Sequence, residues 1–310
     1  MIDKIKLFIP NKRLDTKNQN IQNQRKTDTN TIKGHIKNFG ISQNIDGIFL
    51  QGSLAKYLND ENITPLTKEQ IKESVYLLQD DLKVDFSNAI VTGLEFGTSI
   101  ILDNPVSLYL QCMGTVPRKV KYTAENDKIE TINYLSPKGK GIYTFTLYDK
   151  IQECINHKIS IPETYQGKNV LRLEYKIQRN QGMKNLFYNP ISLFCLYEDN
   201  TLYILKNKFS EFYNSIEKIH RDILIPVSLK NNLTQKGFED LFCEIQRQTN
   251  PDIYNNFLYQ VNEMGLLRKD SLKNIKKKNR KKSKEYTFSK TNDLIVELNK
   301  KLQIQGLYEP

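Results

Sequence analysis

The chain has 310 residues, 38% of them hydrophobic, and carries 46 Lys and Arg against 35 Asp and Glu, a net charge of +11. This length allows one large domain or two moderate ones, and the positive charge favours an anionic partner, first of all nucleic acid. Lysine-rich usage in an AT-rich genome is the alternative explanation. The four cysteines form no Cys-x-x-Cys pair, which argues against a zinc ribbon or a disulfide scaffold and favours a reducing compartment. No run approaches the ~18–20 apolar residues of a membrane span, and the N-terminus has no signal-peptide core, so we expect a cytoplasmic protein with no membrane partner.

Residues 2–10 predict a first β-strand, because every second position is apolar: Ile5, Leu7 and Ile9. Residues 11–31 are polar and have no periodicity, so we expect a long loop or a partly disordered insertion there. Residues 31–50 return to a β pattern, broken at Gly40 and Gly47, which predicts two or more strands in hairpin order.

The stretch QGSLAKYL at residues 51–58 predicts a Gly-Ser turn followed by a short helix. Lys56 in this helix either contacts a phosphate or is an ordinary solvated lysine. Residues 67–84 predict a longer helix that covers a sheet, because Thr67 and Gln70 form a capping box ahead of an apolar stripe. Residues 89–102 are strongly β in character and contain one carboxylate, Glu95, which is costly in a strand unless it is paired, exposed or bound to a metal.

Residues 129–135 and 142–148 predict a β-hairpin around the turn SPKGKG. Its second strand ends at Tyr148, and Asp149 is a natural N-cap for a helix that contains Lys150 and Glu153. Tyr148 is therefore a candidate nucleophile, although a packed aromatic residue at a strand end is the simpler alternative.

Residues 169–178 alternate again and predict another strand, with Arg172 and Glu174 on one face. An ordinary ion pair within the strand would explain this pair of residues equally well. The polar groups that remain in the first half are Glu95, Tyr148 with Lys150 and Glu153, and Arg172 with Glu174.

The sequence changes from β-rich to α-rich at about residues 180–200, and helices are predicted near 204–220, 234–248, 251–264, 268–283 and 291–304. We therefore expect a catalytic domain over 1–200 and a helical region for DNA binding or association over 201–310. Its densest basic segment is expected to bind the DNA backbone without sequence preference; the candidate contacts are Lys276, Lys277, Lys278, Arg280, Lys281 and Lys282.

The sequence contains no P-loop, GxGxxG, HExxH or GxSxG motif, and its three histidines are scattered. Oxygen ligands alone favour Mg²⁺ or Mn²⁺, which stabilise phosphoryl oxygens. A tyrosine next to such an ion can attack a phosphodiester and form a phosphotyrosine, provided that a lysine, a metal or a base helps it lose its proton. The composition and spacing permit a transesterification site of this kind.

The order of these segments resembles rolling-circle replication initiators of the filamentous-phage gene II/gene X type and their phage and plasmid relatives. The resemblance covers roughly residues 1–180 and rests on MIDKIKLFIP, QGSLAKYL, VTGLEFG, TFTLYDKIQE and NVLRLEYKIQR in that order. It implies an α+β fold in which an antiparallel-sheet catalytic domain, flanked by helices, precedes a helical basic C-terminal region. It also implies a metal-dependent, site-specific endonuclease and strand transferase in a bacterial host cell.

By this resemblance Tyr148 would nick one DNA strand at an origin, leaving a 5′-phosphotyrosine and a free 3′-hydroxyl primer. Glu95 and Glu174 would bind Mg²⁺ or Mn²⁺, with Glu153 as a further ligand. Lys150 and Arg172 would steady the scissile phosphate or the phenolate. Gly93 stands where the family often has an arginine, and Glu95 is longer than the aspartate usual there, so this part of the motif departs from the family.

Origin DNA, double- and single-stranded, is the implied partner; host replication proteins and a second copy of the chain are further candidates. The alternative function is a DNA-binding regulator of a phage or plasmid without catalysis, and a third is an RNA-binding protein that stacks bases on its aromatic residues. The nuclease hypothesis predicts that Tyr148, Glu95 and Glu174 converge in one cleft, whereas the regulator hypothesis predicts separate environments for them.

Overall fold

The computed structural model describes residues 2–15, 18–27, 31–125, 129–137, 141–219 and 291–307, with isolated residues between 239 and 277. Within these residues the strands form one ten-stranded sheet in the order β2-β3-β4-β5-β1-β6-β10-β9-β8-β7, and each neighbouring pair is antiparallel. The strands are β1 (Ile2–Pro10), β2 (Gln22–Lys26), β3 (Ile32–Ile36), β4 (Phe39–Gln43), β5 (Gly47–Ser53), β6 (Ile90–Leu102), β7 (Val120–Glu125), β8 (Ile129–Leu135), β9 (Tyr143–Asp149) and β10 (Asn169–Ile177).

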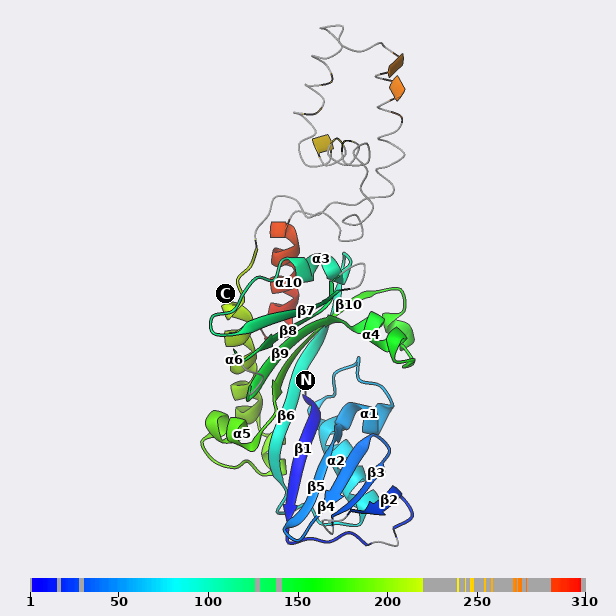
Figure 1. Ribbon diagram of the computed structural model, residues 1–310, viewed down its shortest axis with the longest axis vertical. Helices are drawn as coiled ribbons and strands as arrows, with labels where there is room; N and C mark the ends of the chain where they lie inside the picture. The colour runs from blue at the N-terminus through cyan, green and yellow to red at the C-terminus, as the bar shows by residue number, and fades with distance from the viewer. Residues whose placement is uncertain are drawn as a thin grey trace.

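The 13-residue strand β6 joins the two halves of the sheet (Figure 1). Its residues 90–96 pair with β1, and its residues 94–102 pair with β10. One half of the sheet therefore consists of β1–β5 and the other of β7–β10. The N-terminal strand lies in the interior of the sheet, next to β6, and this position brings the start of the chain close to β10.

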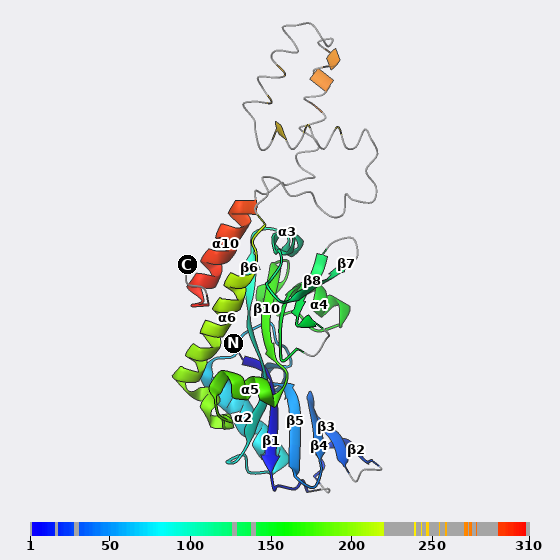
Figure 2. The same ribbon diagram turned by 60° about the vertical axis from the view of Figure 1, so that its left-hand side comes forward.

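One face of the sheet is apolar and is covered by helices (Figure 2). These are α2 (Lys68–Leu82), α5 (Asn180–Phe187), α6 (Asp199–Ser215) and α10 (Thr291–Ile304). In α2 the predicted capping box of Thr67 and Gln70 is formed, and the apolar stripe is buried. Alternate strand residues of β1, β5, β6 and β10 supply the other side of this core, so the period-2 pattern and the helical stripes meet in one hydrophobic cluster.

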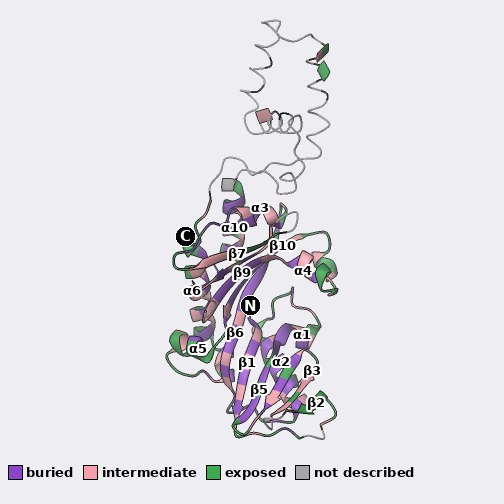
Figure 3. Cartoon of the chain, in the orientation of Figure 1, coloured by how far each residue is buried: buried purple, intermediate pink, exposed green. Residues whose placement is uncertain are grey.

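Both α6 and α10 pack in the same core as the sheet, because Phe209 and Leu298 are buried in it. Figure 3 shows buried residues along the strands of this sheet. The first helix predicted after the domain boundary, near 204–220, is observed as α6 at 199–215. The predicted helices at 234–248, 251–264 and 268–283 lie almost entirely outside the described residues. The division into domains 1–200 and 201–310 stays a prediction. Helices α6 and α10, however, contribute to the core of the sheet itself.

The opposite face of the sheet is polar and carries only short elements. A small second core, built around Cys154 and Val170 with Ile63, packs α4 (Lys150–Asn156) and the loop before α2 against the end of β10. Helix α1 (Leu54–Asn59), which follows β5 with Ser53 as its N-cap, and α3 (Val106–Gln111), which follows β6, instead bury apolar residues in the main core, among them Tyr57 and Tyr109. The polar residues at the middle of the opposite face therefore remain accessible.

The predicted fold class, α+β with an antiparallel sheet flanked by helices, is confirmed. The expectation of a long loop over residues 11–31 is wrong in part, because Gln22–Lys26 forms the edge strand β2, which pairs with β3. All five residues of β2 are exposed, so the sequence shows no alternation there. No helix in the described part of the chain is both long and apolar enough to cross a bilayer.

Candidate active site

A cleft of about 450 Å³ opens on the polar face where β1, β6, β10 and β9 lie side by side. Its wall combines carboxylates, amines and one phenol from six elements: β1, α1, β6, β9, α4 and β10. The lining residues are Asp3, Lys4, Asn38, Gln51, Gly52, Ser53, Lys56, Asn62, Glu95, Tyr148, Glu153, Glu174 and Lys176. The cleft therefore brings together residues that lie as far apart in the chain as Asp3 and Lys176.

Strand register explains why these side chains meet. On β10, Arg172 lies opposite Tyr148 of β9, and Lys176 lies opposite Glu95 of β6. Because side chains two residues apart share a face of a strand, Arg172, Glu174 and Lys176 all point to the polar side. Gly97 of β6 lies opposite Glu174, and a Cβ at this glycine would lie only 2.0 Å from the Leu173 carbonyl oxygen. Because Gly97 has no side chain, the backbones of β6 and β10 can approach each other closely beside the cleft.

Tyr148 donates its phenolic hydrogen to Oε1 of Glu174 at 2.8 Å. Burial and the adjacent Glu174 carboxylate raise the pKa of Tyr148 well above its usual value, against the opposing effect of the Arg172 guanidinium. Burial opposes ionisation of Glu174, but Arg172 and Lys176 outweigh it and lower the pKa of this carboxyl to about 2. At neutral pH the pair is therefore a neutral phenol bonded to a carboxylate.

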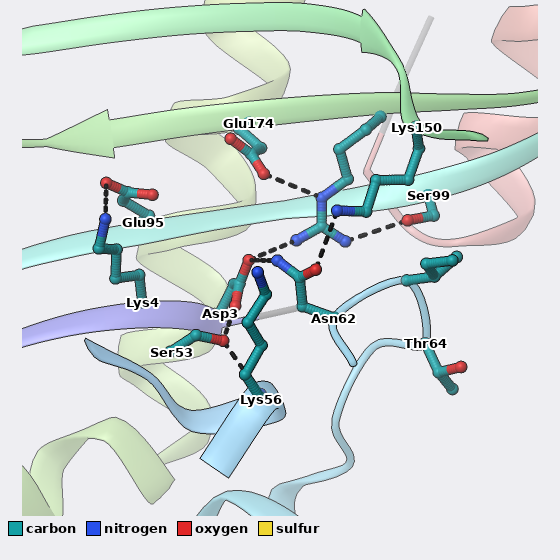
Figure 4. Close-up of polar contacts among 12 residues, drawn as sticks. Asp3, Lys4, Ser53, Lys56, Asn62, Thr64, Glu95, Ser99, Lys150 and Glu174 are labelled. Carbon is teal, nitrogen blue, oxygen red and sulfur yellow. Dashed lines mark hydrogen bonds and ion pairs between the residues drawn. The ribbon is translucent and has the colours of Figure 1, made fainter. Parts of the chain in front are cut away.

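Arg172 organises the floor of the cleft without lining it. Its guanidinium donates to Oε1 of Glu174 at 3.2 Å, to Oγ of Ser99 at 3.0 Å and to Oδ2 of Asp3 at 3.2 Å. The side chain is almost fully enclosed, since Arg172 is 2% exposed. Asp3 is held in turn by hydrogen bonds from Ser53 and Asn62 (Figure 4). A buried charge needs partners on every side, and this network supplies them.

Lys176 connects the two carboxylates that were predicted to bind metal. Its ammonium lies 2.9 Å from Oε2 of Glu174 and 3.8 Å from Oε2 of Glu95. Lys4 lies 3.8 Å from the other oxygen of Glu95 (Figure 4). The nearby carboxylates outweigh burial and raise the pKa of Lys176, so it carries its positive charge at neutral pH. Both lysines line the cleft and can reach an anion bound in it.

Lys150 and Glu153 belong to the first turns of α4, whose N-cap is Asp149. Lys150 is fully buried, donates to Oε2 of Glu153 at 2.8 Å and to Oδ1 of Asn62 at 2.9 Å, and lies 5.8 Å from the centre of the Tyr148 ring. Strand β9 ends at Asp149, so Lys150 approaches Tyr148 from a helix and not from the same strand. Its contacts position Glu153 and Asn62 at the rim of the cleft.

The structure brings most of the sequence-predicted site together. Tyr148, Glu95, Glu174, Glu153 and Lys56 line the cleft, while the side chains of Lys150 and Arg172 lie beneath its surface. Of the predicted C-terminal DNA contacts, Lys277 is helical and exposed. The other five lie outside the described residues: Lys276, Lys278, Arg280, Lys281 and Lys282.

Sequence reasoning did not single out several residues of the cleft, among them Asp3, Lys4, Asn62 and Lys176. Lys176 was detectable, because it continues the period-2 face of Arg172 and Glu174. Asp3 was detectable only as a charge on the apolar phase of the first strand, next to Ile5. Asn62 lies in a loop and gave no signal, since its place in the cleft depends on tertiary contacts.

The donor chemistry of the cleft fits a hard divalent ion. Mg²⁺ is commonly held by one or two carboxylates and keeps several waters, and Glu95 and Glu174 already share one cation, the ammonium of Lys176. No group of three or more His, Cys, Asp or Glu side chains arranged to hold a metal is found in the part of the chain that the structure describes. An ion bound here would therefore depend on two carboxylates and would have to displace Lys176.

Comparison with protein-family models gives no match, and no curated protein matches the sequence. Among solved structures, the chain is similar to a rolling circle replication initiator protein from Geobacillus stearothermophilus. The TM-score is 0.27 and the sequence identity 10%, over 59% of this chain and 76% of that chain. With so low a TM-score and identity, no residue role or activity is transferred from that protein.

Proposed function

We propose that the protein is a tyrosine-type DNA endonuclease and strand transferase that initiates rolling-circle replication. The observation that carries this proposal is the convergence of Tyr148, Glu95 and Glu174 in one cleft with Lys4, Lys56 and Lys176. A phenol, carboxylates and ammonium groups around one space match the needs of phosphodiester transesterification. The order of sequence motifs that resembles the gene II/gene X initiators supports the same activity.

In the proposed reaction, Oη of Tyr148 attacks the phosphorus of one DNA strand and the bond to the 3′-oxygen breaks. The phenolic proton passes to Glu174, and the departing oxygen takes a proton from solvent to become a 3′-hydroxyl. The tyrosine remains linked to the 5′-phosphate, and a later attack by a 3′-hydroxyl reverses the step and rejoins DNA.

The chain's own cations would control this proton transfer. Glu174 is a weak base while Lys176 contacts it, because that contact helps to lower its pKa. A phosphate bound by Lys176 and Lys56 would draw the ammonium of Lys176 away from Glu174 and raise the basicity of the carboxylate. Arg172 and Lys150 are too buried to touch DNA. Of the two roles that the resemblance implies, steadying the scissile phosphate or the phenolate, we therefore keep only the second and assign both residues positioning roles beside Tyr148.

Glu95 and Glu174 would hold Mg²⁺ or Mn²⁺, with Glu153 nearby on the rim. The bound ion would supply positive charge to the phosphoryl oxygens. Origin DNA is the proposed substrate, and the exposed Lys277 on the basic C-terminal segment is proposed to contact the DNA backbone. Host replication proteins and a second copy of the chain are proposed as further partners.

The decisive experiment is a nicking assay on supercoiled DNA that carries the sequences flanking the protein's own gene. Protein would be added with Mn²⁺, with Mg²⁺ or with EDTA, and denaturing gels would show protein attached to labelled DNA. We expect a metal-dependent nick and a covalent adduct that disappear in Tyr148→Phe. Tyr122→Phe, which alters an exposed tyrosine of β7, is the matched control and should keep both. Tight binding without a nick under any condition would replace this proposal with the DNA-binding regulator.

A further inference from the structure

A second hollow, of about 780 Å³, lies on the same polar face over β1–β5. We call it the basic groove and define it by six of its lining residues: Lys6, Arg25, Lys33, His35, Phe49 and Gln51. Gln51 also lines the cleft of Tyr148, so the two depressions adjoin on one surface. Figure 1 shows the strands that form the groove, β1 to β5, beside β6, which carries Glu95.

The charge of the basic groove is of one sign. Lys6, Arg25 and Lys33 come from three different strands, and the described residues that line the groove include no aspartate or glutamate. Arg25 and Lys33 lie opposite each other in the pairing of β2 with β3, and both are exposed. Three cations along one surface provide the positive potential that binds a phosphate backbone.

The groove also contains an accessible aromatic surface. Phe49 stacks on Phe8 with ring centroids 4.6 Å apart, and Phe49 remains 39% exposed. The hydrophobic core lies on the other face of the sheet. Packing in this core therefore does not explain why two large apolar rings lie on this otherwise polar face. A nucleotide base can stack on such a ring, provided that the base is not already stacked in a duplex.

A glycine keeps the floor of the groove open. A Cβ added at Gly40 would meet only the Gln51 carbonyl oxygen, at 3.8 Å, which is an ordinary contact. Gly40 lies opposite both His35 and Gln51 in the strand pairing, so its missing side chain leaves space between two hydrogen-bonding groups. Ser42 and Thr92 add further polar groups to the lining. These groups can bind base edges without fixing one sequence.

We infer that the basic groove binds the unpaired DNA strand next to the phosphate that Tyr148 attacks. Phe49 would stack one base, while Lys6, Arg25 and Lys33 would bind successive phosphates. This inference rests on the proposed nuclease function for its choice of DNA over RNA. It also places a strand-separating reaction before the nick, because a base that stacks on Phe49 must already be unpaired.

The test is fluorescence anisotropy with a labelled 20-nucleotide oligothymidylate, in EDTA so that no cleavage is expected to complicate binding. We expect Phe49→Ala to weaken binding by about tenfold, the loss typical of one base stack. The double variant with Arg25→Ala and Lys33→Ala should also weaken binding and should reduce the dependence of log K on log salt by about 1.4, two phosphate contacts on a single strand. Gly40→Leu should block the groove while keeping its charges.

Two controls alter equivalent side chains on the helical side of the sheet. Tyr76→Ala removes an exposed ring from α2, and Lys300→Ala removes an exposed ammonium from α10. Both should bind the oligonucleotide as the unaltered protein does. Circular dichroism of each variant separates lost binding from lost folding.

The outcomes distinguish this inference from the proposed function. If Tyr148→Phe binds the oligonucleotide normally but no protein ever forms an adduct, the nuclease fails and the groove stands. If the groove variants bind as tightly as the unaltered protein while adducts still form, the groove inference is wrong and the nuclease stands. Equal affinity for a 20-base-pair duplex would overturn the single-strand assignment, and tenfold tighter binding of oligouridylate would replace DNA with RNA.

Discussion

Tyr148 and Glu174, from neighbouring strands and 26 residues apart in sequence, form a direct hydrogen bond in which the phenol is the donor. The carboxylate that accepts this bond is also the group that makes the tyrosine harder to ionise. The resting cleft therefore holds its proposed nucleophile in the protonated form, and activation requires a change in the surroundings of Glu174.

Glu174→Gln should lower the pKa of Tyr148. The substitution removes the negative charge that, after burial, contributes most to raising this pKa. Carbon-13 NMR of the tyrosine ring, with Tyr148→Phe to assign the resonance, measures the change. We expect the Tyr148 resonance of the unaltered protein to stay unchanged through pH 10.5 and that of Glu174→Gln to begin shifting at lower pH than in the unaltered protein. An identical titration in both would show that Glu174 does not influence the phenol.

Ionisation of Glu174 should make the free energy of unfolding depend on pH in the acid range. Its pKa is lowered from 4.5 to about 2 in the folded protein, so its contribution is fully present above pH 4.5 and is lost as the pH falls through 2. The difference corresponds to a free energy of unfolding on the order of 3 kcal/mol. Urea unfolding between pH 2 and 6 should show a shallower pH slope for Glu174→Gln. An unchanged slope would contradict the prediction.

Arg172→Met should be strongly destabilising. It would leave the carboxylates of Asp3 and Glu174 buried without their shared cation, a loss that typically costs about 3–5 kcal/mol. Arg179→Met, which alters an exposed arginine just after the same strand, at the N-cap of α5, is the control and should change the free energy of unfolding by less than about 0.5 kcal/mol. Urea midpoints at pH 7 compare the two, and equal midpoints would mean that the buried network contributes little.

Gly97→Ala should force β6 and β10 apart. The added Cβ would overlap the Leu173 carbonyl oxygen, which belongs to rigid backbone, and we expect a loss of about 1–3 kcal/mol. Gly40→Ala is the control, because the same methyl group makes only an ordinary contact there, 3.8 Å from the Gln51 carbonyl oxygen. Thermal unfolding measures both variants. A Gly97→Ala protein as stable as Gly40→Ala would show that the strands can separate without cost.

Lys176→Met should strengthen metal binding. Removing the ammonium frees Glu95 and Glu174 from their shared partner, and we expect Mn²⁺ to bind about tenfold more tightly, equivalent to ~1.4 kcal/mol. Electron paramagnetic resonance measures free Mn²⁺ directly, and the variant with both Glu95→Gln and Glu174→Gln provides the background. If Mn²⁺ binds neither the unaltered protein nor Lys176→Met, the proposed metal site is wrong.

The sequence predicted the elements of this fold better than their assembly. Alternation located the strands that carry Glu95, Tyr148 and Glu174, because a half-buried sheet imposes period 2 on its residues. The alternation of apolar and polar residues did not predict β2, because both faces of that strand are exposed and no alternation is needed there. Two partners of Arg172, Asp3 and Ser99, could not be predicted, since they reach it only through strand order and register.

The burial of Lys150 and Arg172 was equally hidden from the sequence. The sequence near a tyrosine does not show whether a lysine or arginine faces solvent or lies beneath the surface. The packing of α4 and of the loop at Asn62 buries these two side chains, and their burial excludes contact with the phosphate and leaves both residues with positioning roles.

The position of β1 inside the sheet has a consequence for synthesis on the ribosome. Asp3 leaves the ribosome 169 residues ahead of its ion-pair partner Arg172. Strand β1 can pair with β5 and β6 before β10 is made, but the floor of the cleft closes only when β10 has emerged. A nascent chain that stops short of β10 thus lacks both Arg172 and Glu174, so the cleft cannot be completed until this strand has been translated.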